Sequence, residues 1–418
     1  MLVKTILNRC HKFKSFVYGN VNFSIYEGKE CIEVEVEPRR NGKTICSCCH
    51  QPAPGYDISP EPRRFEFIPL WGFAVYLIYF MRRVNCHRCG VKIEYVPWGY
   101  GKKQLTKVYM QYLADWSKSL SWKEVAMRFQ TSWEKVFRSV EYIVEWGLKY
   151  RSMEGITAIG VDEIQWRKGH KYLTLVYQIN AGCIRLLWIG KDRTEESFTK
   201  FFDEFGEKRY QMIEYVCSDM WKPYLKVIRK KLKQAIHILD RFHIVARLNK
   251  ALDEVRAGEH RKMKQDGYHP LLTHSRWALL KRPENLTEKQ NIKLKDLLKY
   301  NLKSVRAYLL KEQFQQLWEY VSVAWAGKFI DRWTTQVMRS KIEPLKKEAQ
   351  TIRKHKPLIL NWFKAKKSFS SGIVEGLNNK VKLTMRKSYG FKQFRSIEIA
   401  LYHNLGKLPE PPSTHRFC

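Results

Sequence analysis

The stretch ITAIGVDEIQW, residues 156–166, carries two adjacent acids, Asp162 and Glu163, directly after a run of apolar residues. The apolar run is typical of a buried strand, and YLTLVYQI at residues 172–179 predicts a second strand after a turn at residues 168–169. We expect Asp162 to lie at the end of the first strand. An ionised carboxylate inside a protein core is costly unless it is paired or binds a metal, so Asp162 must face a partner.

The residues that follow predict the remaining parts of one sheet. A turn at residues 181–182 leads to a third strand. Then come an amphipathic helix over residues 194–208 with Thr194 as its N-cap, a fourth strand over 212–220, a helix over 223–233 and a fifth strand over 234–240. This is the order of an RNase H-like domain, in which the first and fourth strands are neighbours. Asp219 ends the fourth strand, so we expect it beside Asp162.

A third acid, Glu375, lies in SGIVEGLNN, residues 371–379, in the first turn of a helix that Ser370 or Ser371 is expected to cap. We expect this helix to end near Gly390. Three clustered carboxylates can hold two Mg²⁺ ions roughly 3.5–4 Å apart, which activate a water or a 3′-hydroxyl and stabilise the leaving oxygen. Each acid alone also has a structural explanation, as a strand-end, N-cap or first-turn residue. Together, in this strand order, they favour a metal site.

The composition narrows the class of protein. The 418 residues include 76 Lys plus Arg against 41 Asp plus Glu, and the formal charge of +35 is typical of a nucleic-acid-binding protein. The longest apolar run, residues 68–81, is too short to span a bilayer as a helix. The N-terminus lacks a signal-peptide pattern, so we expect a cytoplasmic protein without a membrane partner. Its ten Cys then indicate metal binding or free thiols rather than disulfides.

Two CxxC pairs predict one structural zinc site. The predicted ligands are Cys46, Cys49, Cys86 and Cys89. Four thiolates can surround one Zn²⁺ at roughly 2.3 Å, and the β-like runs at residues 63–70 and 73–83 between the pairs predict the hairpin of a zinc ribbon. Cys48, His50 or His87 could replace one ligand. Scattered buried thiols are the alternative, which a basic cytosolic protein makes less favourable.

The segment at residues 121–144, SWKEVAMRFQTSWEKVFRSVEYIV, predicts a helix-turn-helix. Thr131 and Ser132 would cap the second helix. Its outer face would then present Trp133, Lys135 and Arg138 to the major groove of DNA. A plain helical hairpin has the same pattern, and the net charge and the adjoining zinc motif favour the DNA-binding alternative.

These motifs together resemble the transposases of the ISL3 insertion-sequence family. The resemblance rests on the CxxC pairs, the helix-turn-helix and four strings: IGVDEIQWRKGHKYLTLVYQI (159–179), SDMWKPY (218–224), LDRFHIVARLNKALDEVR (239–256) and EGLNNKVKLTMRKSYGF (375–391). It implies a D-D-E transposase in which Asp162, Asp219 and Glu375 are the catalytic acids and hold Mg²⁺ or Mn²⁺. It also implies that the helices between Asp219 and Glu375 are an insertion into the RNase H-like fold.

Further polar residues adjoin these strings. Asp240 and His243 could orient a metal ligand, although an N-cap Asp with a satisfied core His is the alternative. Along the last helix we expect contacts with the DNA backbone from Lys380, Lys382, Arg386 and Lys387. A solvated basic face is the alternative. Trp325 and Trp333 could stack on unpaired bases, but core packing is the favoured role for both.

The predicted protein is therefore an α+β multidomain enzyme. The expected parts are a strand-rich extension (1–41), a zinc ribbon-like domain (42–99), a helix-turn-helix domain (100–150), the first part of an RNase H-like core (155–245), a helical insertion (246–366), the final core helix (367–408) and a tail (409–418). It would bind the terminal inverted repeats of its element as a homodimer or higher oligomer, cut the strands and join 3′-hydroxyls to target DNA. The alternatives are a non-catalytic, transposase-derived DNA-binding protein and an RNase H-like nuclease without strand transfer.

Overall fold

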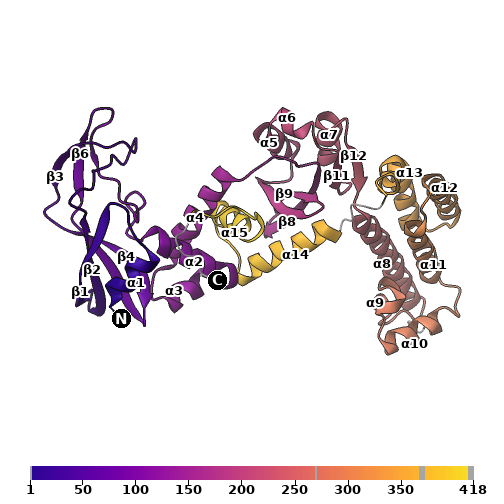
Figure 1. The fold of residues 1–418 in the computed structure, drawn as a ribbon. Helices are drawn as coiled ribbons and strands as arrows, with labels where there is room; N and C mark the ends of the chain where they lie inside the picture. Colours follow the sequence, from indigo (N-terminus) through magenta and orange to yellow (C-terminus); the bar gives the residue numbers. More distant parts are fainter. Residues whose placement is uncertain (1, 269–270, 367–371, 413–418) are drawn as a thin grey trace. The chain divides into compact units, whose positions relative to one another are not determined.

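The computed structural model describes residues 2–268, 271–366 and 372–412. Two compact units emerge: one comprises the residues up to Ser152 together with those from Leu383 onward, and the other comprises Met153–Lys382. We describe each unit by itself (Figure 1). In the described part of the chain, no helix combines the length and the apolar character that crossing a bilayer requires.

The first unit begins with a helix, α1 (Val3–Cys10), where the sequence predicted only strands. It is followed by a four-stranded sheet in the order β1-β2-β5-β4. The strands are β1 (Phe16–Tyr26), β2 (Lys29–Pro38), β4 (Arg63–Leu70) and β5 (Phe73–Tyr79). Strands β4 and β5 form the predicted hairpin, but β5 pairs in parallel with β2. The hairpin therefore belongs to this sheet rather than to the zinc motif, and the expected boundary at residue 41 does not separate two independent sheets.

A smaller sheet carries the cysteine pairs. Its order is β3-β6-β7, formed by β3 (Gly55–Ile58), β6 (Arg82–Cys86) and β7 (Gly90–Ile93). The unit is completed by α2 (Lys107–Ser119), α3 (Trp122–Arg128), α4 (Trp133–Tyr150) and α15 (Phe394–Leu405). Helix α3 starts with a capping box between Ser121 and Glu124, and Ser132 caps α4 as predicted. Helix α15 packs against α4 and was not separated from the preceding helix in the sequence analysis.

The second unit contains a five-stranded sheet in the order β10-β9-β8-β11-β12. Its strands are β8 (Ala158–Arg167), β9 (Lys171–Asn180), β10 (Cys183–Lys191), β11 (Tyr215–Ser218) and β12 (Ile236–Leu239). The first three are antiparallel neighbours, whereas β11 runs parallel to both β8 and β12. The first and fourth strands are thus neighbours, as the sequence predicted. Helices α5 (Glu195–Phe205), α6 (Glu207–Tyr210) and α7 (Lys222–Lys231) connect β10 to β12.

One face of this sheet is closed by aromatic residues of α5. Phe198, Phe201, Phe202 and Phe205 recur at helical spacing and pack with the sheet residues Ile159, Val161, Val176 and Val216. Thr194 caps α5 by accepting a hydrogen bond from the backbone N–H of Ser197. Alternation along β8 turns Gly160 and Asp162 to the opposite face. The apolar layer therefore holds the sheet while leaving the Asp162 face for other partners.

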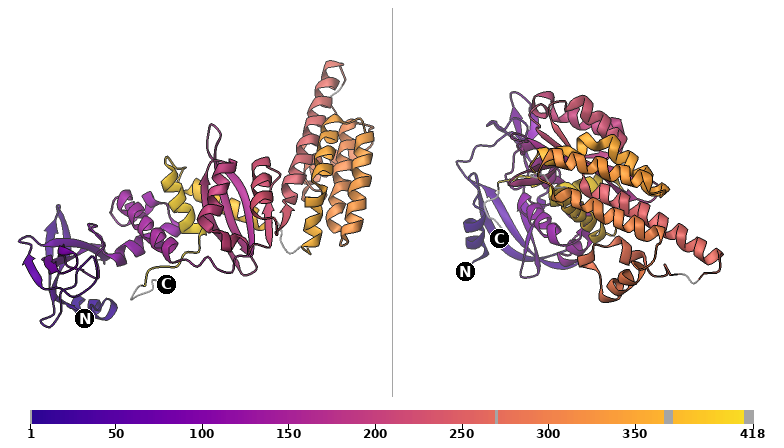
Figure 2. Two further views of the ribbon diagram at one scale, coloured as in Figure 1. Left: turned by 90° about the horizontal axis from the view of Figure 1, so that it is seen from above. Right: turned by 90° about the vertical axis from the view of Figure 1, so that its right-hand side faces the viewer.

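The described residues between β12 and the last helix of this unit form helices and loops without a strand. The helices are α8 (Arg241–Gln265), α9 (Arg276–Leu280), α10 (Glu288–Leu297), α11 (Lys303–Gln315), α12 (Val323–Arg339) and α13 (Glu343–Lys364), with short 3₁₀ turns at Pro283–Asn285 and Gln316–Glu319. Helices α8, α11, α12 and α13 lie side by side as a bundle (Figures 1 and 2). Because α8 runs unbroken from the Asp240 cap, the predicted boundary at residue 245 falls inside a helix.

Candidate active site and metal centre

Asp162 lies within β8 rather than at its end, so that prediction was wrong. The strand continues to Arg167 because it pairs with β9 throughout, with Asp162 opposite Leu175. On its other side β8 pairs with β11 only as far as Gly160, which lies opposite Cys217. Asp162 is two residues beyond Gly160, and Asp219 is two residues beyond Cys217. The two acids therefore meet where the parallel pairing stops.

The Asp162 carboxylate is buried, with 7% of the residue exposed. Its Oδ1 accepts a hydrogen bond of 2.8 Å from the backbone N–H of Glu163. Its Oδ2 accepts a hydrogen bond from the Asn378 side-chain amide of α14 (Gly372–Lys387). Tyr177 donates to the Asn378 Oδ1 at 2.8 Å, which fixes the orientation of that amide. The sequence analysis did not single out Asn378, although it stands in the string that carries the resemblance.

Gly160 explains how α14 comes so close to the sheet. A Cβ atom at this position would lie 2.5 Å from the Val374 Cγ2 atom, so a larger residue would push the helix away. Val374 and Asn378 are one turn apart on the buried face of α14. The absence of a side chain at residue 160 thus lets the helix place its amide on Asp162.

Asp219 follows β11 directly, as predicted, and is half-buried. Its Oδ1 accepts a hydrogen bond of 2.9 Å from the Trp221 backbone N–H at the start of α7, so the N-cap alternative describes part of its role. Burial is the main cause that raises the pKa of Asp219 to about 6, and the Asp162 and Asp240 carboxylates raise it further. This acid therefore lies among other carboxylates with little solvent to separate them.

Asp240 and His243 belong to the same group. Asp240 is the N-cap of α8 and accepts a 2.7 Å hydrogen bond from the Phe242 backbone N–H, which matches the structural alternative. His243 lies one turn further on, with its Nε2 3.8 Å from the Asp162 Oδ2 and 3.9 Å from the Asp240 Oδ2. The interaction with Asp162 is the main cause that raises the pKa of His243 to about 9, with Asp240 and Asp219 adding to it. His243 faces these acids rather than an apolar core.

Glu163 is a member of this group that the sequence analysis quoted but did not use. Its Oε1 lies 3.4 Å from the Arg193 Nη1, and its buried Oε2 has no hydrogen-bond partner among the described residues. Burial, followed by the charges of Asp219 and Asp162, raises the pKa of Glu163 to about 7. Successive side chains of a strand point to opposite faces, so the sequence gave no reason to group Glu163 with Asp162. The end of pairing with β11 brings Asp219 near both.

Glu375 stands apart from these acids. It lies in the first turn of α14 and its side chain is exposed. The described contact between α14 and Asp162 runs through Asn378, one turn beyond Glu375. The predicted caps of this helix, Ser370 and Ser371, lie outside the described residues. Glu375 is thus on the helix that reaches the site, and its part in a metal site stays a prediction.

The acid group has the chemistry that a divalent cation requires. Asp219 interacts with the carboxylates of Asp162, Glu163 and Asp240, while one arginine and one histidine oppose the charge of this group. The raised pKa values of Asp219 and Glu163 show that burial disfavours full ionisation. Oxygen ligands with this charge excess suit Mg²⁺ or Mn²⁺. These residues have the chemistry to hold a divalent metal, although among the described residues only the four cysteines bring three or more ligand atoms within 4.8 Å of one another.

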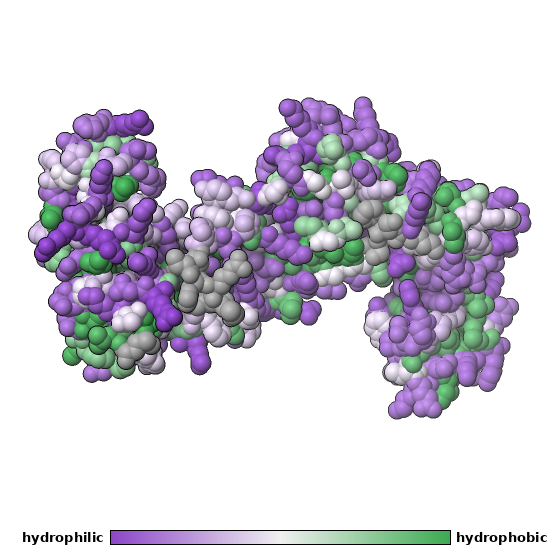
Figure 3. Space-filling model, in the orientation of Figure 1, coloured by the Kyte–Doolittle hydropathy of each residue, from purple (hydrophilic) through white to green (hydrophobic). Residues whose placement is uncertain are grey.

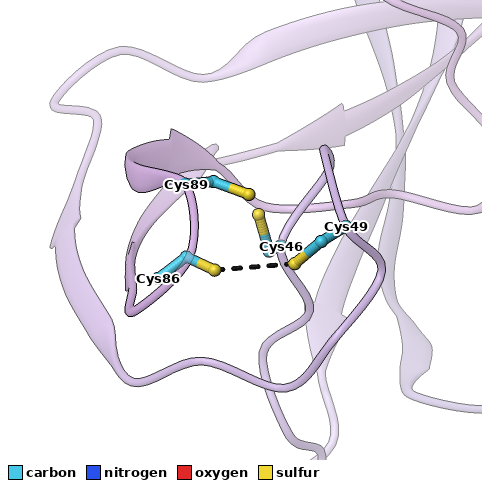
Figure 4. A group of neighbouring side chains, drawn as sticks. All are labelled: Cys46, Cys49, Cys86 and Cys89. Atoms are coloured by element: carbon cyan, nitrogen blue, oxygen red, sulfur yellow. Dashed lines mark hydrogen bonds between the residues drawn. The ribbon is translucent and has the colours of Figure 1, made fainter.

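The four predicted cysteines converge in the first unit. The Sγ atoms of Cys46, Cys49, Cys86 and Cys89 all lie within 4.8 Å of one another (Figure 4). One pair precedes β3 and the other joins β6 to β7, so two turns face each other. The backbone N–H of Arg88 is the main cause that lowers the pKa of Cys86 to about 7, whereas a hydrogen bond with the Cys48 thiol is the main cause that raises the pKa of Cys89. The cluster could hold a zinc ion.

None of the possible substitutes belongs to the group of four, although the Cys48 side chain forms a hydrogen bond with Cys89. Cys48 and His87 are exposed, and neither belongs to the group of four. The His50 ring packs edge-on against Tyr95, with centroids 4.8 Å apart. The described residues thus assign the cluster to the four cysteines alone.

The residues of the helix-turn-helix that were predicted to contact DNA differ in exposure and in their ion pairs. Trp133 is 54% exposed, and Arg138 is exposed beside Glu141. Lys135 instead forms a 2.8 Å ion pair with Glu66 of β4, which ties α4 to the N-terminal sheet. The inner residues of this motif are buried as expected: Val125, Ala126, Val136, Val140 and Ile143. A major-groove contact by Lys135 would therefore require breaking an internal ion pair.

The basic residues of α14 that were predicted to contact DNA also differ in exposure. Lys382 and Arg386 are exposed, and so is Lys380. The Lys387 ammonium donates to the backbone carbonyls of Ser117 at 2.9 Å and Lys118 at 3.0 Å, at the end of α2. Lys387 thus has a structural partner that the sequence could not reveal.

The two tryptophans of the helical bundle also differ. Trp333 is 1% exposed and donates from its Nε1 to the Leu310 carbonyl at 2.8 Å, so core packing is confirmed. Trp325 is 60% exposed, with the Lys328 ammonium 4.6 Å from its ring. Only Trp325 has a ring accessible to a base.

Comparison with known proteins identifies the family of this chain. A family described as a transposase family, the ISL3 group of DDE transposases, matches residues 159–401. The transposase for insertion sequence element IS1001 of Bordetella parapertussis is 28% identical over 333 residues, which cover 79% of this chain and 81% of that protein. The transposase for IS1557 of Mycobacterium tuberculosis is 27% identical over 406 residues, covering 91% of this chain and 90% of that protein.

The match spans more than half of the chain, so the protein is a DNA transposase, an enzyme that cleaves and transfers DNA. It belongs to the ISL3 transposase family, as its motifs predicted. Membership implies the use of divalent metal ions and a DNA substrate.

Proposed function

We propose that the protein acts by a D-D-E mechanism on the terminal inverted repeats of its own insertion sequence. Asp162, Asp219 and Glu375 would hold Mg²⁺ or Mn²⁺, and the products would be cleaved element ends joined through their 3′-hydroxyls to target DNA. The observation that carries this proposal is the meeting of Asp162 and Asp219 where the pairing of β8 and β11 stops. The sheet order also supports an RNase H-like core interrupted by the α8–α13 insertion.

The residues around the acids would each have a defined task. Bound divalent ions would supply the Lewis acidity that activates the attacking hydroxyl and stabilises the leaving oxygen. Asn378 holds the Asp162 carboxylate in place, because its amide donates to Oδ2 while Tyr177 fixes its other end. Protonated His243 offsets the charge of Asp162 and Asp240. Glu375 would complete the ligand set if the first turn of α14 bends toward the sheet when metal and DNA are bound.

The first unit would recognise the DNA ends. One zinc ion at the four cysteines would hold the two turns of the small sheet together, and α3 with α4 would form the helix-turn-helix. Trp133, Arg138 and Arg386 of this unit are exposed, and Lys380 and Lys382 of the second unit, also exposed, would add contacts with the DNA backbone. Because an element has two ends, a homodimer or larger assembly would act on DNA.

A strand-resolved cleavage assay tests this proposal. The protein is incubated with end-repeat DNA, a plasmid target and Mg²⁺ or Mn²⁺, and each labelled strand is followed separately. The proposal expects metal-dependent cuts at the repeat ends, followed by joined products. Binding without cuts would instead support a DNA-binding protein that has lost catalysis, and cuts without joined products would support a nuclease.

A further inference from the structure

Arg193 lies beside the acid group and contacts two aromatic rings. It lies between β10 and α5, and its guanidinium carbon is 3.8 Å from the centroid of the Tyr172 ring and 4.6 Å from that of the Trp221 ring. The Trp221 Nε1 also donates to the Arg193 backbone carbonyl at 3.1 Å. Stacking on aromatic faces and this hydrogen bond fix both the guanidinium and its backbone. The side chain is nevertheless 31% exposed.

The donors of this guanidinium are poorly used within the protein. Arginine carries five N–H donors, and a charge-assisted hydrogen bond is typically about 2.7–2.9 Å long. The contact of Arg193 with Glu163 is 3.4 Å, and the described residues offer it no other side-chain acceptor. Arg247, by contrast, bonds both oxygens of Glu348, at 2.7 and 3.2 Å. Arg193 is thus positioned like a structural arginine but has donors left for another partner.

The location determines what that partner would be. Glu163 interacts with Asp219 and Asp162, so Arg193 borders the carboxylates toward which a DNA strand must move. A phosphate approaching these acids is repelled unless a cation faces it, and the arginine fork matches phosphate oxygens with two parallel hydrogen bonds. We propose that Arg193 binds a phosphate of the DNA strand next to the bond that is cut. This inference rests on the proposed acid site at Asp162 and Asp219.

The direct test is a phosphate scan on end-repeat DNA. Single phosphates around the cleavage point are replaced by neutral methylphosphonates, and binding is measured for the wild type and for Arg193→Ala. We expect one or two neighbouring replacements to weaken wild-type binding about tenfold and to have no effect on Arg193→Ala. At all other positions both proteins should lose affinity equally. Arg193→Lys should recover part of the affinity for unmodified DNA because it keeps the charge.

Controls separate this role from a structural one. Arg209→Ala removes an arginine that also lies 3.4 Å from a carboxylate, Glu154, but that partner is 78% exposed and lies outside the acid group. Arg209→Ala should lose affinity at the same replaced phosphates as the wild type. Arg193→Gln keeps the chain length and serves if Arg193→Ala unfolds early in thermal denaturation.

The outcomes distinguish this inference from the proposed function. The inference is overturned if Arg193→Ala loses affinity at the same replaced phosphates as the wild type. Arg193→Gln is judged in the same way where Arg193→Ala is unstable. This holds even when the wild type cuts DNA. A wild type that binds but does not cut leaves the scan readable, because binding alone is measured. In that case the proposed D-D-E mechanism is wrong, but the scan still tests whether Arg193 contacts a phosphate.

Discussion

Neighbouring basic residues on one helix can have opposite roles. Lys387 donates to two carbonyls at the end of α2, whereas Arg386 is exposed. We predict that Lys387→Met lowers the free energy of unfolding by about 1–2 kcal/mol, because the carbonyls lose a charged donor, and leaves the affinity for DNA nearly unchanged. Arg386→Met should weaken DNA binding and leave the free energy of unfolding nearly unchanged. Urea denaturation and DNA binding of both variants test this, and a Lys387→Met variant with intact stability and weakened binding would contradict it.

The residues of the site were predictable to different degrees. Asp162 and Asp219 could be placed together because strand order alone makes β8 and β11 neighbours. Glu163 could not, because its closeness to Asp219 depends on where the pairing with β11 ends. The roles of Asn378 and Gly160 depend on the approach of α14, a contact between segments more than 200 residues apart in sequence. Such long-range packing leaves no local pattern.

At the scale of elements, the small sheet depends on the cysteine cluster. We predict one zinc ion per chain, lost in Cys86→Ser together with the order of β6 and β7, because metal binding and folding are linked in such modules. Cys48→Ser is the matched control and should keep the metal, since Cys48 is exposed outside the cluster. Metal analysis of protein purified without chelator decides the matter. Wild-type protein without zinc, or Cys86→Ser with it, would disprove the assignment.

His237 of β12 should contribute less to the stability of the central sheet in mild acid than at neutral pH. His237 is buried and its Nε2 lies 2.8 Å from the Ser218 Oγ; burial, then His355 and Arg229, lowers its pKa to about 4. The unfolded chain takes up this proton below about pH 6.5 and the folded chain only near pH 4, so the contribution of His237 to stability falls as pH drops through that window, by at most about 3 kcal/mol. We predict that His237→Asn loses less stability than the wild type between pH 7 and 5 in urea denaturation. Equal losses would contradict this cause.

Local patterns predicted elements better than their partners. The turns at residues 168–169 and 181–182 and the Thr194 cap were correct because each depends on nearby residues. The sequence also predicted the hairpin of β4 and β5. It did not predict the parallel pairing of β5 with β2, because the loop that carries the first cysteine pair separates these strands in sequence. Helix α1 was missed because its eight residues show no side-chain cap and only one buried position, Leu7.

For the whole molecule, charge should govern how DNA binds. The formal charge is +35, and hydrophilic residues cover most of the face drawn in Figure 3. Each phosphate contact releases counterions, so we predict that affinity falls by roughly 10³-fold or more between 50 and 200 mM salt. Sequence-unrelated DNA should show a similar slope, because most of these contacts do not depend on sequence. A binding constant that changes less than about threefold over this range would contradict a large phosphate interface.

The central claim is that Asp162, Asp219 and Glu375 form one metal-dependent cleavage site. The most direct measurement compares wild type, Asp162→Asn, Asp219→Asn and Glu375→Gln in single-turnover cleavage of end-repeat DNA with Mg²⁺, with binding measured in parallel. Asp203→Asn serves as the control, because that carboxylate is exposed and pairs with Lys231.

We predict that each of the three site variants cuts at least about 100-fold more slowly, because the amide keeps the shape but loses the charge that holds the metal, while DNA affinity changes little. The control should cut at the wild-type rate. A site variant that cuts near the wild-type rate would remove that residue from the site. If Asp219→Asn were that variant, Asp240 would take its place in the account, and if it were Asp162→Asn, the proposed site itself would be wrong.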